Sequence, residues 1–114
     1  MRDERAFLFD MLESARYIQT YIGGMTFESF ASDRKTQDAV LRRFTIIGEA
    51  AKHISTNSRQ ALPALPFKDM AGMRDVLMHD YWRLKLRLIW ETIQNDLPPL
   101  IAALEPLLPP PLQA

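Results

Sequence analysis

Apolar residues recur at intervals of three and four along most of the chain, which is the spacing of one face of an α-helix. The first stripe predicts a helix over Glu4–Ile22, and Gly23-Gly24 should end it because glycine tolerates the left-handed geometry of a helix C-terminus. The second stripe predicts a helix that Ser32 or Asp33 caps and that runs to about Thr56.

Two further helices are predicted in the second half of the chain. Pro66 suits the first turn of a third helix, which should pass through Leu77. The apolar positions from Leu84 to Leu97 predict a fourth helix. Pro98-Pro99 should kink or restart it, and one more amphipathic stretch should reach Leu104.

Short connections between these helices favour an all-α, up-down helical bundle of four to five helices. Phe27 and Phe30 are expected to dock a short turn onto the core, and Gly48 in mid-helix would let another helix approach closely. Residues 1–106 are predicted to form a single domain. The proline-rich tail, residues 107–114, is expected to be disordered.

Composition narrows the possible functions. The 114 residues contain 14 basic and 14 acidic side chains, so no overall field draws the molecule onto nucleic acid or an anionic membrane, and any such contact must be local. The absence of cysteine excludes disulfides, thiolate metal sites and a cysteine nucleophile.

The chain also lacks signals for export or membrane insertion. The charged N-terminus, Met1-Arg2-Asp3-Glu4-Arg5, is not a secretory signal, and no stretch approaches the roughly 20 apolar residues that a transmembrane helix needs. We therefore expect a cytoplasmic protein that does not interact with membranes.

Polar residues are densest between the third and fourth helices, where Arg74, Asp75, His79 and Tyr81 lie close in sequence. On an ideal helix Asp75 and His79 share a face, whereas Arg74 and His79 diverge by about 140°. Arg74 and His79 can reach one ligand only if the helix ends near His79 or if a second copy of the chain supplies a group. Histidine moves protons near neutral pH and arginine holds phosphate, so the pair suits phosphodiester cleavage.

At these positions the sequence resembles the HepT-like toxins of the HEPN superfamily, whose signature is R-x4-H-x-Y. Arg74, His79 and Tyr81 match that signature. Other stretches that look like this family are residues 46–53, 65–67, 90–91 and 95–98.

The resemblance implies an HEPN-like bundle and a metal-independent endoribonuclease that acts as a homodimer, with no cofactor and no metal site. Arg74 and His79 would be the catalytic residues, and DNA would resist cleavage because it lacks the 2′-hydroxyl. Asp75 stands where the family often has a neutral polar residue. Its carboxylate could orient His79 in a supporting role, or it could repel phosphate.

The family is usually paired with a minimal nucleotidyltransferase antitoxin that transfers AMP onto the motif tyrosine. The resemblance therefore implies the toxin of a prokaryotic type VII-like toxin–antitoxin system, with Tyr81 as the modified residue. An anionic AMP group beside Arg74 and His79 would repel RNA.

The sequence also allows other roles for the polar residues and an alternative function. Arg83, Lys85 and Arg87 are RNA-binding candidates, although a charged helix face is commonly just solvated. His53 is expected to be a solvated side chain and not a metal ligand. A non-catalytic helical module that docks a nucleotidyltransferase, or that binds a nucleotide without cutting anything, is the alternative function.

Overall fold

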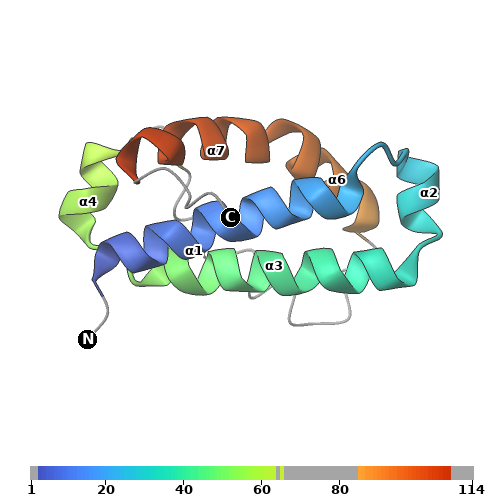
Figure 1. The fold of residues 1–114 in the computed structure, drawn as a ribbon, viewed down its shortest axis with the longest axis horizontal. Coiled ribbons are helices and arrows are strands. Elements are labelled where there is room, and N and C mark those ends of the chain that lie inside the picture. Colours follow the sequence, from blue (N-terminus) through green and yellow to red (C-terminus); the bar gives the residue numbers. More distant parts are fainter. Residues whose placement is uncertain (1–2, 64, 66–84, 109–114) are drawn as a thin grey trace, which may run out of the picture.

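A computed structural model describes residues 3–63, 65 and 85–108, and every regular element in that part of the chain is a helix (Figure 1). The elements are α1 (Glu4–Ile22), α2 (Phe27–Ala31), α3 (Arg34–Lys52), α4 (Thr56–Ala61), α6 (Leu86–Asn95), α7 (Leu97–Leu104) and the 3₁₀ turn η2 (Glu105–Leu107). The predicted all-α fold class is confirmed. The third helix expected from Pro66 lies outside the described residues.

In the described part of the chain, the long helices α1 and α3 and the pair α6 and α7 run along the length of the bundle (Figure 1). Helices α1 and α3 pack side by side and run in opposite directions, and α6 followed by α7 lies along the other side of the core. The short helices α2 and α4 sit at opposite ends of the bundle. None of the helices described is both long and apolar enough to cross a membrane.

Helix α1 has the predicted bounds, and local chemistry explains both ends. The Asp3 carboxylate accepts a hydrogen bond from the backbone N–H of Arg5 (2.9 Å) and so caps the first turn. At the other end Gly23 has φ +51°, and its N–H donates to the Gln19 carbonyl (3.0 Å). A glycine is favoured there because other residues pay a steric cost at positive φ.

The connection expected to be a turn after α1 is itself the short helix α2. Thr26 and Ser29 form a capping box, in which each side chain bonds the backbone N–H of the other. Phe30 is buried, with 1% of its surface exposed. The prediction that Phe30 docks this segment onto the core is confirmed.

Helix α3 begins after Asp33, one of the two predicted caps. The Asp33 carboxylate accepts bonds from the backbone N–H (3.0 Å) and the hydroxyl (2.7 Å) of Thr36. These bonds lower the pKa of the Asp33 carboxyl below its ordinary value of 3.8. Gly48 lies buried in the C-terminal half of this helix.

The predicted extension of this helix to Thr56 is wrong. Helix α3 ends at Lys52, and Ser55 begins a separate helix, α4, by accepting a bond from the N–H of Ser58 (3.2 Å). The Arg59 guanidinium stabilises the junction between α3 and α4 by donating hydrogen bonds to the carbonyls of Ile54 (3.0 Å) and Ala51 (2.6 Å). These carbonyls lie at and just beyond the end of α3, where few backbone N–H groups remain as donors, although the N–H of Ile54 also donates to the Ala51 carbonyl (3.3 Å).

Glu4 connects the start of α1 to the start of α4. Its carboxylate accepts bonds from the Ser58 hydroxyl (2.7 Å) and from the backbone N–H of Ser55. The hydrogen bond from the Ser58 side chain is the main cause of a lowered pKa for the Glu4 carboxyl, and the Ser55 backbone bond adds to it. The ionised carboxylate is therefore the form that stabilises this junction.

We expect Glu4→Gln to destabilise the protein at neutral pH. Because the folded-state pKa of Glu4 lies below its ordinary value of 4.5, its contribution is present above that value and is lost as pH falls through the folded pKa. Urea midpoints of both proteins measured from pH 7 to pH 3 should differ at the upper end and converge at the lower end. A gap that persists unchanged to pH 3 would contradict this account.

The helical stretch formed by α6 and α7 is interrupted at Asp96. Leu97, predicted as part of the fourth helix, is instead the first residue of α7, and Pro98 and Pro99 occupy its first turn. Proline is tolerated there because first-turn N–H groups have no partner within the helix. The restart expected at the prolines is confirmed, with the break just before them.

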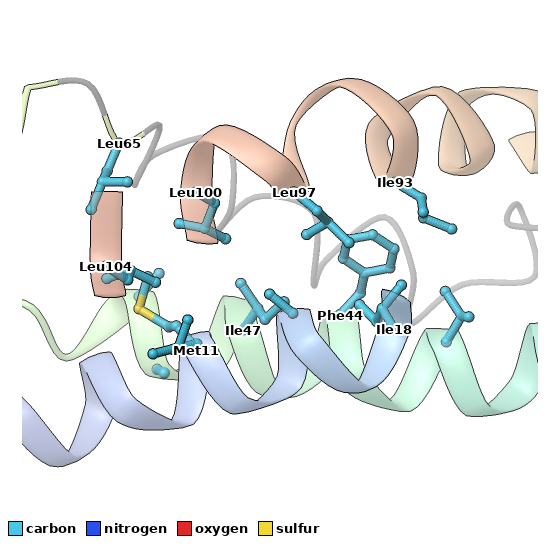
Figure 2. Packing of buried hydrophobic residues seen from close by; sticks show 14 of the residues in the cluster. Met11, Ile18, Phe44, Ile47, Leu65, Ile93, Leu97, Leu100 and Leu104 are labelled. Atoms are coloured by element: carbon cyan, nitrogen blue, oxygen red, sulfur yellow. The ribbon is translucent and has the colours of Figure 1, made fainter. Parts of the chain in front are cut away.

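A single hydrophobic core fills the space between the α1–α3 pair and the α6–α7 column (Figure 2). Met11 and Ile18 come from α1, and Phe44 and Ile47 from α3, all with at most 2% of their surface exposed. From the other side α6 and α7 contribute Ile93, Leu97, Leu100 and Leu104.

The turn η2 is held against α1. The Arg16 guanidinium pairs with the Glu105 carboxylate of η2 (2.6 Å). Leu108 packs partly buried against the core. Residues 109–114, most of the tail expected to be disordered, lie outside the described residues.

Candidate functional site

The motif predicted to carry the chemistry falls in the segment 66–84, which lies outside the described residues. Arg74, Asp75, His79, Tyr81 and the RNA-binding candidate Arg83 are all in it. Their roles stay predictions. The structure does describe the residues on either side of the segment, together with two of the RNA-binding candidates, Lys85 and Arg87.

Leu65 fixes the chain just before the segment. Its side chain is buried in the core, and its N–H donates to the Leu62 carbonyl (3.0 Å). Figure 2 shows it pointing into the same apolar space as Leu100 and Leu104 of α7. Leu65, the last described residue before the segment, therefore lies at the end of the bundle near α4 and the last turn of α7.

Lys85 is the first described residue after this segment, and it lies at the opposite end of the bundle from Leu65 (Figure 1). It is exposed and precedes α6, with no side-chain hydrogen bond capping that helix. Two residues further on, the Arg87 guanidinium lies 3.8 Å from the centre of the Phe27 ring. Residues two apart on a helix do not face each other, so Lys85 and Arg87 do not form one continuous basic face.

Aromatic side chains hold this end of the bundle together. Trp90 of α6 meets Phe27 edge-on, with ring centres 6.3 Å apart, and Phe30 at 5.5 Å. These contacts join α2 to α6. The sequence did not reveal the contact between Arg87 and Phe27, because the two residues are far apart in the chain.

A second feature is a groove on the outer side of the α1–α3 pair, with a volume of about 210 Å³. Charged and aromatic side chains line it, including Phe7, Asp10, Arg42, Glu49 and His53. His53 is exposed, as expected for a solvated residue, but its ring also stacks on Phe7, with centres 4.4 Å apart and planes 7° apart. Among the described residues, no cluster of three or more side chains suited to metal binding occurs.

A third feature lies on the same side of the α1–α3 pair. The Arg43 guanidinium is 4.2 Å from the centre of the Tyr17 ring, and its Nε donates to the Tyr21 hydroxyl (3.3 Å). The Tyr17 and Tyr21 rings are stacked with centres 6.0 Å apart. The sequence gives no sign of these aromatic partners of Arg43, because Tyr17 and Tyr21 are distant from it in the chain.

Comparison with known proteins identifies the class to which this bundle belongs: a family of ribonucleases. The chain belongs to the HepT-like ribonuclease family, whose model matches residues 11–107, from within α1 to the end of η2. The resemblance seen in the sequence motif is therefore confirmed. No solved structure shows significant similarity to the chain.

Individual relatives align with this chain over most of their length. The chain is 38% identical over 107 residues to a candidate RNase of Methanocaldococcus jannaschii, covering 94% of this chain and 88% of that protein. It is 38% identical over 106 residues to a candidate ribonuclease HepT of Thermococcus cleftensis, covering 93% and 96%. A candidate RNase of Caldanaerobacter subterraneus is 36% identical over 100 residues, covering 88% and 89%.

Proposed function

We propose that this chain is the toxin of a prokaryotic type VII-like toxin–antitoxin system, a metal-independent endoribonuclease that acts in the cytoplasm. The observation that carries the proposal is the R-x4-H-x-Y motif at Arg74, His79 and Tyr81 in a chain that belongs to the HepT-like ribonuclease family. Incubating the purified chain with single-stranded RNA in the presence of a chelator tests it. Cleavage should occur, and matched DNA should stay intact.

The cleavage step uses only groups that the motif supplies. The RNA 2′-oxygen attacks the adjacent phosphorus, and the bond from phosphorus to the 5′-oxygen of the next nucleotide breaks, leaving a 2′,3′-cyclic phosphate and a 5′-hydroxyl. His79 takes the proton from the attacking hydroxyl or gives one to the leaving oxygen. Arg74 donates hydrogen bonds to the phosphate oxygens as their charge builds.

A homodimer would bring these groups together. On one helix Arg74 and His79 diverge by about 140°, so a single continuous helix does not direct both at one phosphate. Two copies facing each other across a cleft would let Arg74 of one chain serve His79 of its partner. Asp75 would lie on the same helical face as His79, one turn away, and could orient its imidazole.

Regulation would come from a minimal nucleotidyltransferase antitoxin that transfers AMP from ATP onto the Tyr81 hydroxyl, releasing pyrophosphate. The added phosphodiester is anionic and bulky, and it would lie close to Arg74 and His79. It would therefore compete for the phosphate site and repel the RNA backbone.

Tyr81→Phe should abolish the adduct without removing the nuclease. After co-expression with the candidate antitoxin, the intact mass of the unaltered chain should rise by one or more AMP groups, whereas the Tyr81→Phe chain should keep its unmodified mass. Peptide mapping checks the position. An adduct that persists in Tyr81→Phe would place the modification elsewhere, and no adduct in either chain would contradict this mode of regulation.

Asp75 and the zero net charge favour a second candidate, because a carboxylate beside the motif arginine opposes phosphate binding. In this alternative the helices only dock the nucleotidyltransferase or bind a nucleotide. Expression without a partner discriminates between the two. Toxicity that His79→Ala relieves supports the nuclease, and absence of toxicity together with binding of mononucleotides supports the alternative.

A further inference from the structure

Aromatic and cationic side chains alternate along the outer seam between α1 and α3. We define the outer seam by Phe7, Tyr17 and Tyr21 of α1, by Arg42 and Arg43 of α3, and by His53, the residue that caps the C-terminus of α3. At about 100° per residue, its three α1 members fall within about 80° of one another, so they share one helix face. The two helices run antiparallel, and this places Phe7 beside His53 and Tyr17 beside Arg43.

At one end of the outer seam, the flat ring of His53 is exposed to solvent. His53 caps the C-terminus of α3 and is exposed, while its ring lies against Phe7 with planes 7° apart. Phe7 is packed against the hydrophobic core, so the pair is anchored from beneath. A planar group could therefore extend this stack on the uncovered side of His53.

At the other end of the outer seam, the ring of Tyr17 is partly exposed to solvent. Tyr17 is 42% exposed although it is a large aromatic residue. Arg43 covers part of it and is held there by its bond to the Tyr21 hydroxyl. This guanidinium is fixed in place before any ligand arrives, which lowers the entropy lost on binding.

The groove of about 210 Å³ lies at the Phe7–His53 end of the outer seam, and Tyr17, Tyr21 and Arg43 do not line it. Arg42 lines it, is exposed, and has no hydrogen bond or ion pair to any residue that the structure describes. Asp10 and Glu49 also line it, and both are half-buried. The groove thus contains one guanidinium that can bind a ligand and two carboxylates that set its local charge.

We propose that the outer seam binds single-stranded RNA, with bases stacked on Tyr17 and His53 and phosphates held by Arg42 and Arg43. Aromatic faces interleaved with cations are the feature that sequence-tolerant single-strand binding requires. Phe7 and Tyr17 are ten residues apart on α1, a distance of about 15 Å along the axis. A duplex has no exposed base faces to stack, so a single strand is the form that fits.

Asp10 and Glu49 also line the groove, and their negative charges would repel phosphates. The phosphates of the strand should therefore lie towards Arg42 and Arg43 and away from these two carboxylates. The inference rests on the proposed function in that it assigns this surface to the substrate, yet it can be measured without any cleavage.

Binding of a fluorescently labelled single-stranded RNA to the full chain tests the proposal, with His79→Ala as the parent so that the RNA stays intact. Tyr17→Ala and His53→Ala should each weaken binding by about tenfold, since a stacked base contributes about 1–3 kcal/mol. Arg42→Ala should weaken it several-fold and make the dependence of affinity on salt shallower, because one phosphate contact is lost. Duplex RNA should bind less tightly than the single strand.

Matched variants separate stacking and local charge from general effects. Tyr17→Phe and His53→Phe keep a ring and should keep most of the affinity. Lys35→Ala removes an exposed cation of α3 outside the outer seam and should bind like the parent. Circular dichroism confirms that each variant is folded.

The proposal is overturned if Tyr17→Ala, Arg42→Ala and His53→Ala all bind within about twofold of the parent, or if the parent binds no RNA. Crosslinks from RNA that contains 4-thiouridine should map to α1 and α3, and crosslinks confined to other elements would also overturn it. Cleavage by the chain with His79 intact is scored separately. RNA binding that depends on the outer seam in a chain that cuts nothing would refute the nuclease alone.

Discussion

His79→Ala should lower the rate of RNA cleavage by about 10²–10⁴-fold, the contribution that a positioned general acid or base usually makes. Arg74→Ala should cost about 10²–10³-fold, the effect of removing one strong donor to the developing charge. If the two groups act on the same phosphate, the double variant should be little slower than His79→Ala alone. Effects of residues that act as a unit are far from additive.

Single-turnover cleavage of one labelled RNA, with a chelator present, measures these rates. Lys35→Ala is a control for simple loss of a positive charge, since Lys35 is exposed on the first turn of α3. A DNA strand of the same sequence controls for the 2′-hydroxyl. His79→Ala and Arg74→Ala proteins that cut as fast as the unaltered chain would defeat the nuclease assignment, even if the Lys35 control behaved as expected.

Leu104→Ala should lower the free energy of unfolding by about 2–5 kcal/mol, which is a large part of the roughly 5–15 kcal/mol of a typical domain. Leu104 has 0% of its surface exposed, and it lies where α7 packs against α1 (Figure 2). Removing its side chain takes apolar contacts from both helices and leaves a cavity.

Leu88→Ala is the matched control for this change. It deletes the same atoms from α6, but Leu88 is 53% exposed, so the free energy of unfolding should change by only about 0.5 kcal/mol. Urea denaturation followed by circular dichroism gives both values. Equal losses in the two variants would mean that the core between α1 and α7 is not packed as described.

Local signals in the sequence were sufficient for the ends of several helices. Gly23 was predicted to end α1, and Asp33 was one of two predicted caps of α3, because each acts on backbone groups within a few residues of itself. Periodicity also placed the buried faces correctly, as Met11 and Phe44 show. These features depend on propensity and capping, which a single sequence displays.

The errors arose where distant residues decide the structure. Helix α3 ends at Lys52 although the apolar stripe continues to Ile54, since Arg59 satisfies the final carbonyls and Ser55 starts a new helix. Glu4, some fifty positions earlier, completes that junction. No periodic pattern records such a contact.

The candidate functional residues also divide into those that the sequence could reveal and those that it could not. Residue types and spacing were enough to propose chemistry for Arg74 and His79, because the motif is contiguous. The outer seam was not foreseen. Phe7 and His53 meet only after α1 and α3 have paired, so an apolar position and a solvated histidine gave no joint signal.

The bonds of Glu4 have a consequence for anyone who shortens this protein. A deletion that removes residues 1–4 takes away the Asp3 cap of α1 and, with the same cut, the acceptor that holds Ser55 and Ser58. Damage would then appear at residues 55–61, far along the chain from the deletion. Limited proteolysis of such a truncated protein should show new cleavage in α4 before any within α1.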